Sequence, residues 1–117
     1  VADARQRVDS AAEDARRRAR AEADRVIAEA ERHAATVREE ARTLAEKVRT
    51  EGNARADSLV ARASGPTAGI AARVAADRVR REANTQADRI VREADARANV
   101  MVTQAKQQAD ALVKPGS

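Results

Sequence analysis

Apolar side chains recur along this chain with a period of eleven residues. The stretch ADRVRREANTQ, residues 76–86, is followed at once by ADRIVREADAR, then by ANVMVTQAKQQ and ADALV. The first half follows the same scheme, with Ala every eleven residues and a branched residue such as Val37 or Val48 three places later. Offsets of zero, three and seven lie on one face of a helix. The pattern therefore predicts long helices, each with a single apolar stripe.

Eleven residues over three turns give about 3.67 residues per turn, which is typical of a hendecad coiled coil whose stripe runs nearly parallel to the helix axis. Ala at two of the three offsets lets helix backbones approach closely, and the branched residue at the third supplies most of the buried area. We therefore predict a self-association seam. Its members are Ala12, Ala23, Val26, Ala34, Val37, Ala45, Val48, Ala56, Leu59, Ala76, Val79, Ala87, Ile90, Ala98, Met101, Ala109 and Leu112.

The repeat is interrupted once, at ASGPTAG, residues 63–69. Gly65 can take the left-handed conformation that ends a helix, and Pro66 suits the first turn of the next helix. Ala56 and Ala76 are twenty residues apart instead of twenty-two, which would turn the stripe by roughly 160° in a continuous helix. An antiparallel hairpin lets the two stripes face each other, so we favour it over a kinked continuous rod.

The predicted fold is all-α: two long helices, as a helical hairpin or bent rod, with hendecad coiled-coil packing. The first helix is expected over residues 1–64, a Gly/Pro turn over 65–69, the second helix over 66–114 and a tail over 115–117. Acidic residues precede Arg by four positions, for example at Asp77 and Arg81 and at Asp88 and Arg92. Pairs with this spacing are expected to support the helices.

Composition agrees with extended helices and argues against a compact core. The 117 residues include no aromatic side chain and no Cys, and the apolar fraction is mostly Ala. There are 23 basic and 19 acidic residues, interspersed along the chain. This mixture is typical of long helices and coiled coils. The absence of Cys excludes disulfides and thiolate metal sites.

Residues for chemistry are lacking. No glycine-rich phosphate loop and no nucleophile paired with a base is present, and the only histidine, His33, has no Cys or second His to share a metal. We predict no catalytic, cofactor-binding or metal site, hence no enzyme and no small-molecule substrate. Gly52 replaces Ala in the stripe, and we interpret it as a tolerated substitution in preference to a close crossing of helices.

Two kinds of partner are disfavoured. The densest basic run, residues 16–20, lies among Glu13, Asp14 and Glu22, and no aromatic residue is available to stack on bases, which argues against nucleic acid. A lipid surface is disfavoured because the apolar face lacks the Trp and Phe that anchor such helices. No apolar run approaches the roughly 20 residues that span a bilayer.

The chain starts at Val1 without Met, which processing after export or an incomplete chain would explain. We favour an exported or extracellular location over a cytoplasmic one.

Three groups of proteins resemble this chain. The segment ASGPTAGIAARVAADRVRREANTQADRIVREAD, from Ala63 onward, is similar to small, uncharacterised exported Ala/Arg-rich helical proteins of the Bacteroidetes type, a resemblance that implies no activity. Over about the first 64 residues, elevens such as ADRVIAEAERH resemble the right-handed coiled coils of rotary-ATPase peripheral-stalk subunits. The eleven-residue period without Cys or aromatics also resembles group 3 late embryogenesis abundant proteins.

These observations favour a non-catalytic structural protein that associates with itself, as a homo-oligomer or filament, through its Ala/Val stripe into a bundle, sheath or filament. The alternatives are a stress-protective helical protein of the desiccation type, a stalk or scaffold subunit of a larger complex, and a lipid-surface helix.

In a hairpin the second arm would reach back to about Arg17, leaving residues 1–16 without an intramolecular partner. This overhang, roughly 24 Å long, continues the stripe as Ala4, Val8, Ala12 and Ala15. We expect it to be an intermolecular joint whose head-to-tail contacts produce a filament.

Overall fold

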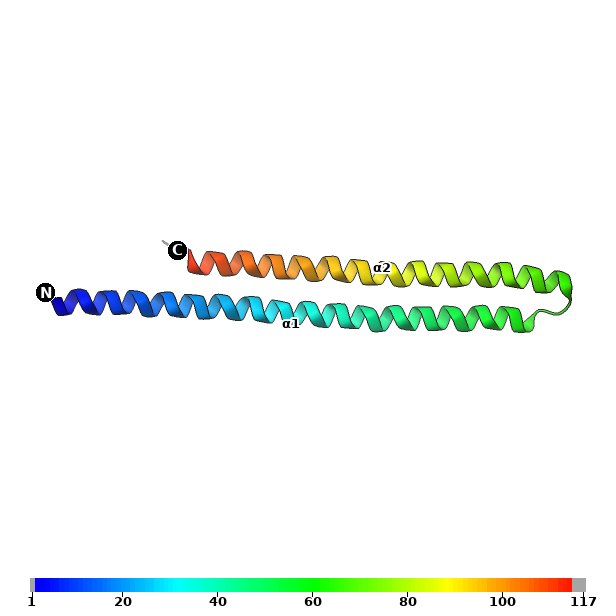
Figure 1. Ribbon diagram of the computed structural model, residues 1–117, viewed down its shortest axis with the longest axis horizontal. Coiled ribbons are helices and arrows are strands. Elements are labelled where there is room, and N and C mark those ends of the chain that lie inside the picture. Colours follow the sequence, from blue (N-terminus) through cyan, green and yellow to red (C-terminus); the bar gives the residue numbers. More distant parts are fainter. Residues whose placement is uncertain (1, 115–117) are drawn as a thin grey trace. The chain divides into compact units, whose positions relative to one another are not determined.

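The computed structural model describes residues 2–114 and contains two long helices, as the repeat predicted. Helix α1 covers Ala2–Arg62 and helix α2 covers Pro66–Val113 (Figure 1). No strand is present in this part of the chain. Val1 and the predicted tail, residues 115–117, lie outside the described residues.

The connection between the helices is shorter than the predicted Gly/Pro turn and begins earlier. Only residues 63–65 are non-helical, and residues 66–69 already belong to the first turn of α2. Gly65 has a φ of 87°, the left-handed conformation that favours glycine. Its carbonyl oxygen accepts a hydrogen bond from the N–H of Gly69 at 2.9 Å. Gly65 therefore caps the start of α2, with Pro66 as the first helical residue, and does not cap the end of α1.

The chain divides into two compact units, each containing a segment of both helices. Unit 2 comprises residues Thr36–Ala96 and is a helical hairpin around the connection. Its core is a double row of small residues with alternating spacings of four and seven: Ala41, Ala45, Gly52 and Ala56 on α1, and Ala76, Ala83, Ala87 and Ala94 on α2. The hairpin form predicted from the register slip is the one present in this unit.

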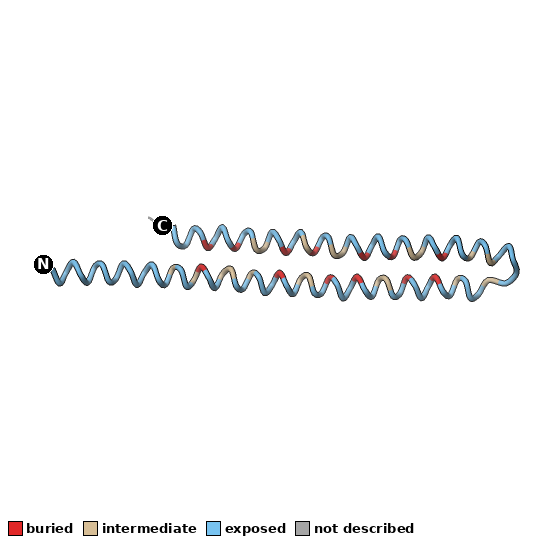
Figure 2. The backbone as a smooth tube through the Cα atoms, viewed as in Figure 1, coloured by how far each residue is buried: buried red, intermediate tan, exposed pale blue. Residues whose placement is uncertain are grey.

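Unit 1 comprises Val1–Ala35 and Arg97–Ser117. Its α1 and α2 segments run antiparallel, with their buried residues turned toward each other (Figure 2). Those buried residues are again all alanines: Ala23 and Ala34 on α1, and Ala98, Ala105 and Ala109 on α2. In both units the core is therefore narrow, and larger apolar side chains stand beside it at intermediate exposure.

Ion pairs along the helices differ from the predicted ones. Local pairs join residues three apart, as in Arg42 with Glu39 at 3.9 Å, or Arg17 with Asp14. Asp77, expected to pair with Arg81, contacts Arg80 at 3.6 Å instead. Asp88 contacts Arg49 of α1 at 2.8 Å. The reason is positional: the arginines beside the core can reach acids on either helix.

Candidate self-association surfaces

The predicted seam is divided by the structure into two sets with different surroundings. Its alanines at positions 23, 34, 45, 56, 76, 87, 98 and 109 are buried against the other arm of the same chain. Its larger residues Val26, Val37, Val48, Leu59, Val79, Ile90 and Met101 have intermediate exposure, and Leu112 is exposed. Ala12 is exposed as well. The buried alanines thus join the two arms, whereas the larger members and Ala12 can still contact another molecule.

One side of unit 2 carries larger residues that share one position of the repeat on both arms: Val37 and Val48 on α1, and Val79 and Ile90 on α2. A shallow groove of about 210 Å³ runs over the crossing of α1 and α2, with Gly52 and Ala83 in its floor. Val48 of α1 and Val79 of α2 line it. Its remaining lining residues are polar: Glu51, Arg55, Glu82 and Gln86. We call this side the valine face.

The opposite side of unit 2 carries ion pairs between the arms. Arg49 contacts Asp88 at 2.8 Å, and Arg80 contacts Asp57 at 2.7 Å. A third pair joins Arg38 to Asp95 at 3.4 Å. Because these arginines and the valines stand on opposite flanks of the alanine core, the hairpin has one charged side and one side with apolar residues.

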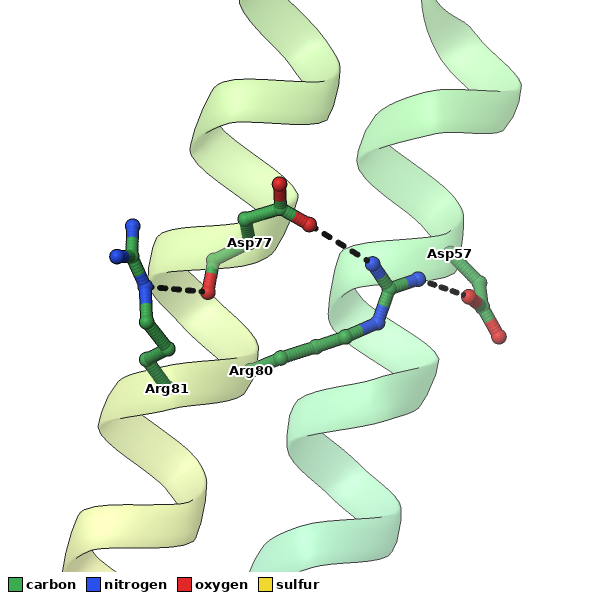
Figure 3. Close-up of polar contacts among 4 residues, drawn as sticks. All are labelled: Asp57, Asp77, Arg80 and Arg81. Carbon is green, nitrogen blue, oxygen red and sulfur yellow. Dashed lines mark hydrogen bonds and ion pairs between the residues drawn. The ribbon is translucent and has the colours of Figure 1, made fainter.

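Arg80 shows how such a pair is built. Its guanidinium reaches from α2 to Asp57 on α1 with one nitrogen and to Asp77 on its own helix with the other (Figure 3). The side chain of Arg81 points away from α1, and its Nε donates a hydrogen bond to the backbone carbonyl of Asp77 at 3.4 Å. A planar guanidinium suits this bridging because its donors are fixed in a fork.

The predicted joint lies on a part of α1 that no described residue covers. Residues 2–18 are all exposed, and Ala19 is the first of intermediate exposure. Ala4, Val8, Ala12 and Ala15 therefore present the stripe to solvent, and the Val8 residue is 67% exposed. We call residues 2–18 the overhang.

Gly52 lies where the two helices approach each other closely. A Cβ built at this position would overlap the Cβ of Ala83 and would lie 3.8 Å from its Cα. The interpretation of Gly52 as a tolerated replacement for Ala was therefore wrong: the helices cross too closely here for any side chain. The cross-arm arginines were also missed, although Arg38, Arg49 and Arg80 share one position of the repeat.

Three other kinds of site were considered for the described residues: a metal site, a basic patch and a membrane-spanning segment. No cluster of three or more potential metal ligands occurs among residues 2–114. The basic run at residues 16–20 is almost wholly exposed, and Arg17 in it is paired with Asp14. Within the described residues, neither helix contains a segment apolar enough to cross a membrane. The candidate surfaces of the described residues are therefore the exposed faces of the two helices.

No protein-family model, no curated protein and no solved structure matches this chain.

Proposed function

We propose that this chain is a non-catalytic structural protein that self-associates into a bundle, sheath or filament. The observation that carries the proposal is the overhang, where Val8 and three alanines of the stripe are exposed on a helix with no described neighbour. In both units the equivalent stripe is buried by a second helix. A helix with an apolar stripe gains stability when that stripe is covered.

The valine face supports the same proposal. Val37, Val48, Val79 and Ile90 are only half-buried by the hairpin. A second helix packed on this face would bury the rest of each side chain. Burial of apolar surface stabilises the association by about 25 cal/mol for each Å² removed from water. Self-association therefore has two surfaces: the overhang and the valine face.

The charge distribution limits the kind of partner. The net charge is +4, with 23 basic and 19 acidic residues interspersed. Several exposed arginines are already neutralised by neighbouring acids, as in Arg25 with Glu22. A polyanion would have to compete with these acids, whereas a second copy offers matching positive and negative positions.

The experiment is sedimentation velocity over a range of concentrations, with electron microscopy of the same samples. The full chain should be helical in buffer and should form larger species as its concentration rises. The variant Val8→Asp and a variant lacking residues 1–18 should both assemble less, while their hairpins stay helical by circular dichroism. A chain that is monomeric at every concentration would refute self-association. A chain that is largely unfolded in dilute buffer would instead favour the stress-protective alternative.

A further inference from the structure

The overhang repeats the positions that hold the two arms of unit 2 together. In unit 2, Gly52 and Ala83 lie opposite each other. Arg49, three residues before Gly52, contacts Asp88, five residues after Ala83. Arg80, three residues before Ala83, contacts Asp57, five residues after Gly52. The crossing is thus approximately two-fold symmetric: each arm supplies one Arg and one acid.

The same three positions occur in the overhang. Val8 lies four repeats of eleven before Gly52, which places it at the same position of the stripe. Arg5 stands three residues before Val8, and Glu13 stands five residues after it. All three residues are exposed, and within the described chain neither Arg5 nor Glu13 forms an ion pair. A single overhang therefore carries both halves of the symmetric arrangement.

We infer that the overhangs of two copies pair with each other, antiparallel, about a two-fold axis at Val8. This inference rests on the proposed self-association and names its partner, a second copy of this chain. Val8 meets Val8 of the second copy, and Arg5 of each copy contacts Glu13 of the other. In the same register Ala4 lies opposite Ala12 of the second copy. The contact is isologous, so it closes after two molecules and is not the head-to-tail joint that the sequence suggested.

The side chains compensate for the larger residue at the axis. Val8 is bulkier than Gly52, so the two overhangs must lie farther apart than the arms of unit 2 at the Gly52 crossing. Glu13 is one methylene longer than Asp57 and Asp88, its counterparts in unit 2. The longer acid lets the ion pair form across the wider gap. In addition, Asp9 and Glu13 are like charges four residues apart, a repulsion that an Arg from a second copy would relieve.

Cysteine cross-linking tests the register, because the chain has no cysteine of its own. Val8→Cys in the full chain should oxidise to a covalent dimer, since residues on the two-fold axis face their own copies within the distance that a disulfide spans. Ala4→Cys alone and Ala12→Cys alone should cross-link poorly, whereas their mixture should give the mixed dimer. Ser10→Cys is the matched control, because Ser10 lies on the opposite side of the helix from Val8.

Charge exchange tests the ion pair. Arg5→Glu should weaken dimerisation about tenfold, because two symmetric pairs are lost and replaced by repulsions. The double variant Arg5→Glu/Glu13→Arg should recover most of the affinity. Arg7→Glu changes the net charge equally but removes no predicted pair, so it should leave the affinity close to that of the parent chain.

The outcomes separate this inference from the proposed function. Self-association together with rapid cross-linking of Val8→Cys and slow cross-linking of Ser10→Cys supports both. Self-association with no preference for Val8→Cys over Ser10→Cys, or with no recovery in the charge-exchanged double variant, overturns the symmetric joint alone. A monomeric parent chain at all concentrations overturns both.

Discussion

Gly52 of α1 lies directly against Ala83 of α2, so closely that a β-carbon on Gly52 would occupy the space of the Ala83 methyl group. Both residues are buried in unit 2. Alanine fills the equivalent position of the repeat elsewhere on α1, for example at Ala41. The crossing of the helices is therefore set here by the absence of a side chain.

Replacing Gly52 with Ala should destabilise the hairpin. Gly to Ala inside a helix normally stabilises by about 1 kcal/mol, but the new methyl group must push the arms apart, and such overpacking costs roughly 1 to 3 kcal/mol. We expect a lower midpoint in urea unfolding followed by circular dichroism. The exchange Gly52→Ala/Ala83→Gly should restore most of the stability, since it moves the methyl group to the other helix. A Gly52→Ala variant that is about 1 kcal/mol more stable than the parent, as expected for an uncrowded helix position, would contradict the close crossing.

The other two described glycines, one in the connection and one in the first turn of α2, provide a contrast. Nothing lies within 4 Å of a Cβ built at Gly69, which is helical. Gly69→Ala should therefore raise stability by about 0.5 to 1 kcal/mol. Gly65 also has open space, but its φ is 87°. Gly65→Ala should lower stability by roughly 1 kcal/mol, because the left-handed conformation costs about that much for a residue with a side chain. Thermal unfolding of the two variants, measured side by side, distinguishes the effects.

The loss of hairpin stability on substitution by Asp should depend on how deeply each stripe residue is buried. Ala87 is fully buried, so Ala87→Asp places an unpaired charge in the core and should cost several kcal/mol. Val37 is half-buried, so Val37→Asp should cost less in hairpin stability while still reducing self-association through the valine face. The control is Arg92→Asp, because Arg92 is exposed and lies beside neither surface. Chemical unfolding reports the first effect and sedimentation the second. A Val37→Asp variant that loses as much stability as Ala87→Asp would contradict the observed division of the stripe.

The ion pair between Arg80 and Asp57 should contribute little stability. Their side chains are 38% and 73% exposed, and exposed pairs typically contribute about 0.2 to 1 kcal/mol. A double-mutant cycle with Arg80→Ala and Asp57→Ala should give a coupling energy in that range, decreasing as salt is added. The cycle Arg81→Ala with Asp57→Ala serves as the reference, because Arg81 points away from α1 (Figure 3). Equal coupling in the two cycles would argue against a specific role for Arg80.

The sequence was sufficient to predict the two helices and the alanine rows, because an eleven-residue period places Ala34, Ala45 and their equivalents on one helix face whatever they contact. It was not sufficient to predict which residues meet across the hairpin. The cross-arm register depends on the length and position of the connection. The turn was predicted over residues 65–69, but only residues 63–65 are non-helical. Without the cross-arm register, Gly52 could not be assigned to Ala83, nor Arg49 to Asp88.

The cross-arm packing also decides which side of unit 2 carries the valines and which side carries the ion pairs. Along one helix, Val48 and Arg49 are consecutive residues, and the period alone does not show on which side of a helix pair each side chain will lie. Once a second, antiparallel helix covers the alanines, these neighbours fall on opposite sides, Val48 on the valine face and Arg49 among the cross-arm ion pairs. The overhang could be predicted because it requires only that the first arm be longer than the second.

The short connection at residues 63–65 also bears on how unit 2 folds. A periodic chain can pair with itself in several ways, because sliding one arm past the other by eleven residues again sets alanine near alanine. Closing a loop of only a few residues costs the least chain entropy, so the first contacts form beside Pro66 and pairing spreads outward from there. Each further step adds residues already near one another, which keeps contact order low at the start and makes folding rapid. The connection therefore selects among near-equivalent alignments by being the place where folding begins.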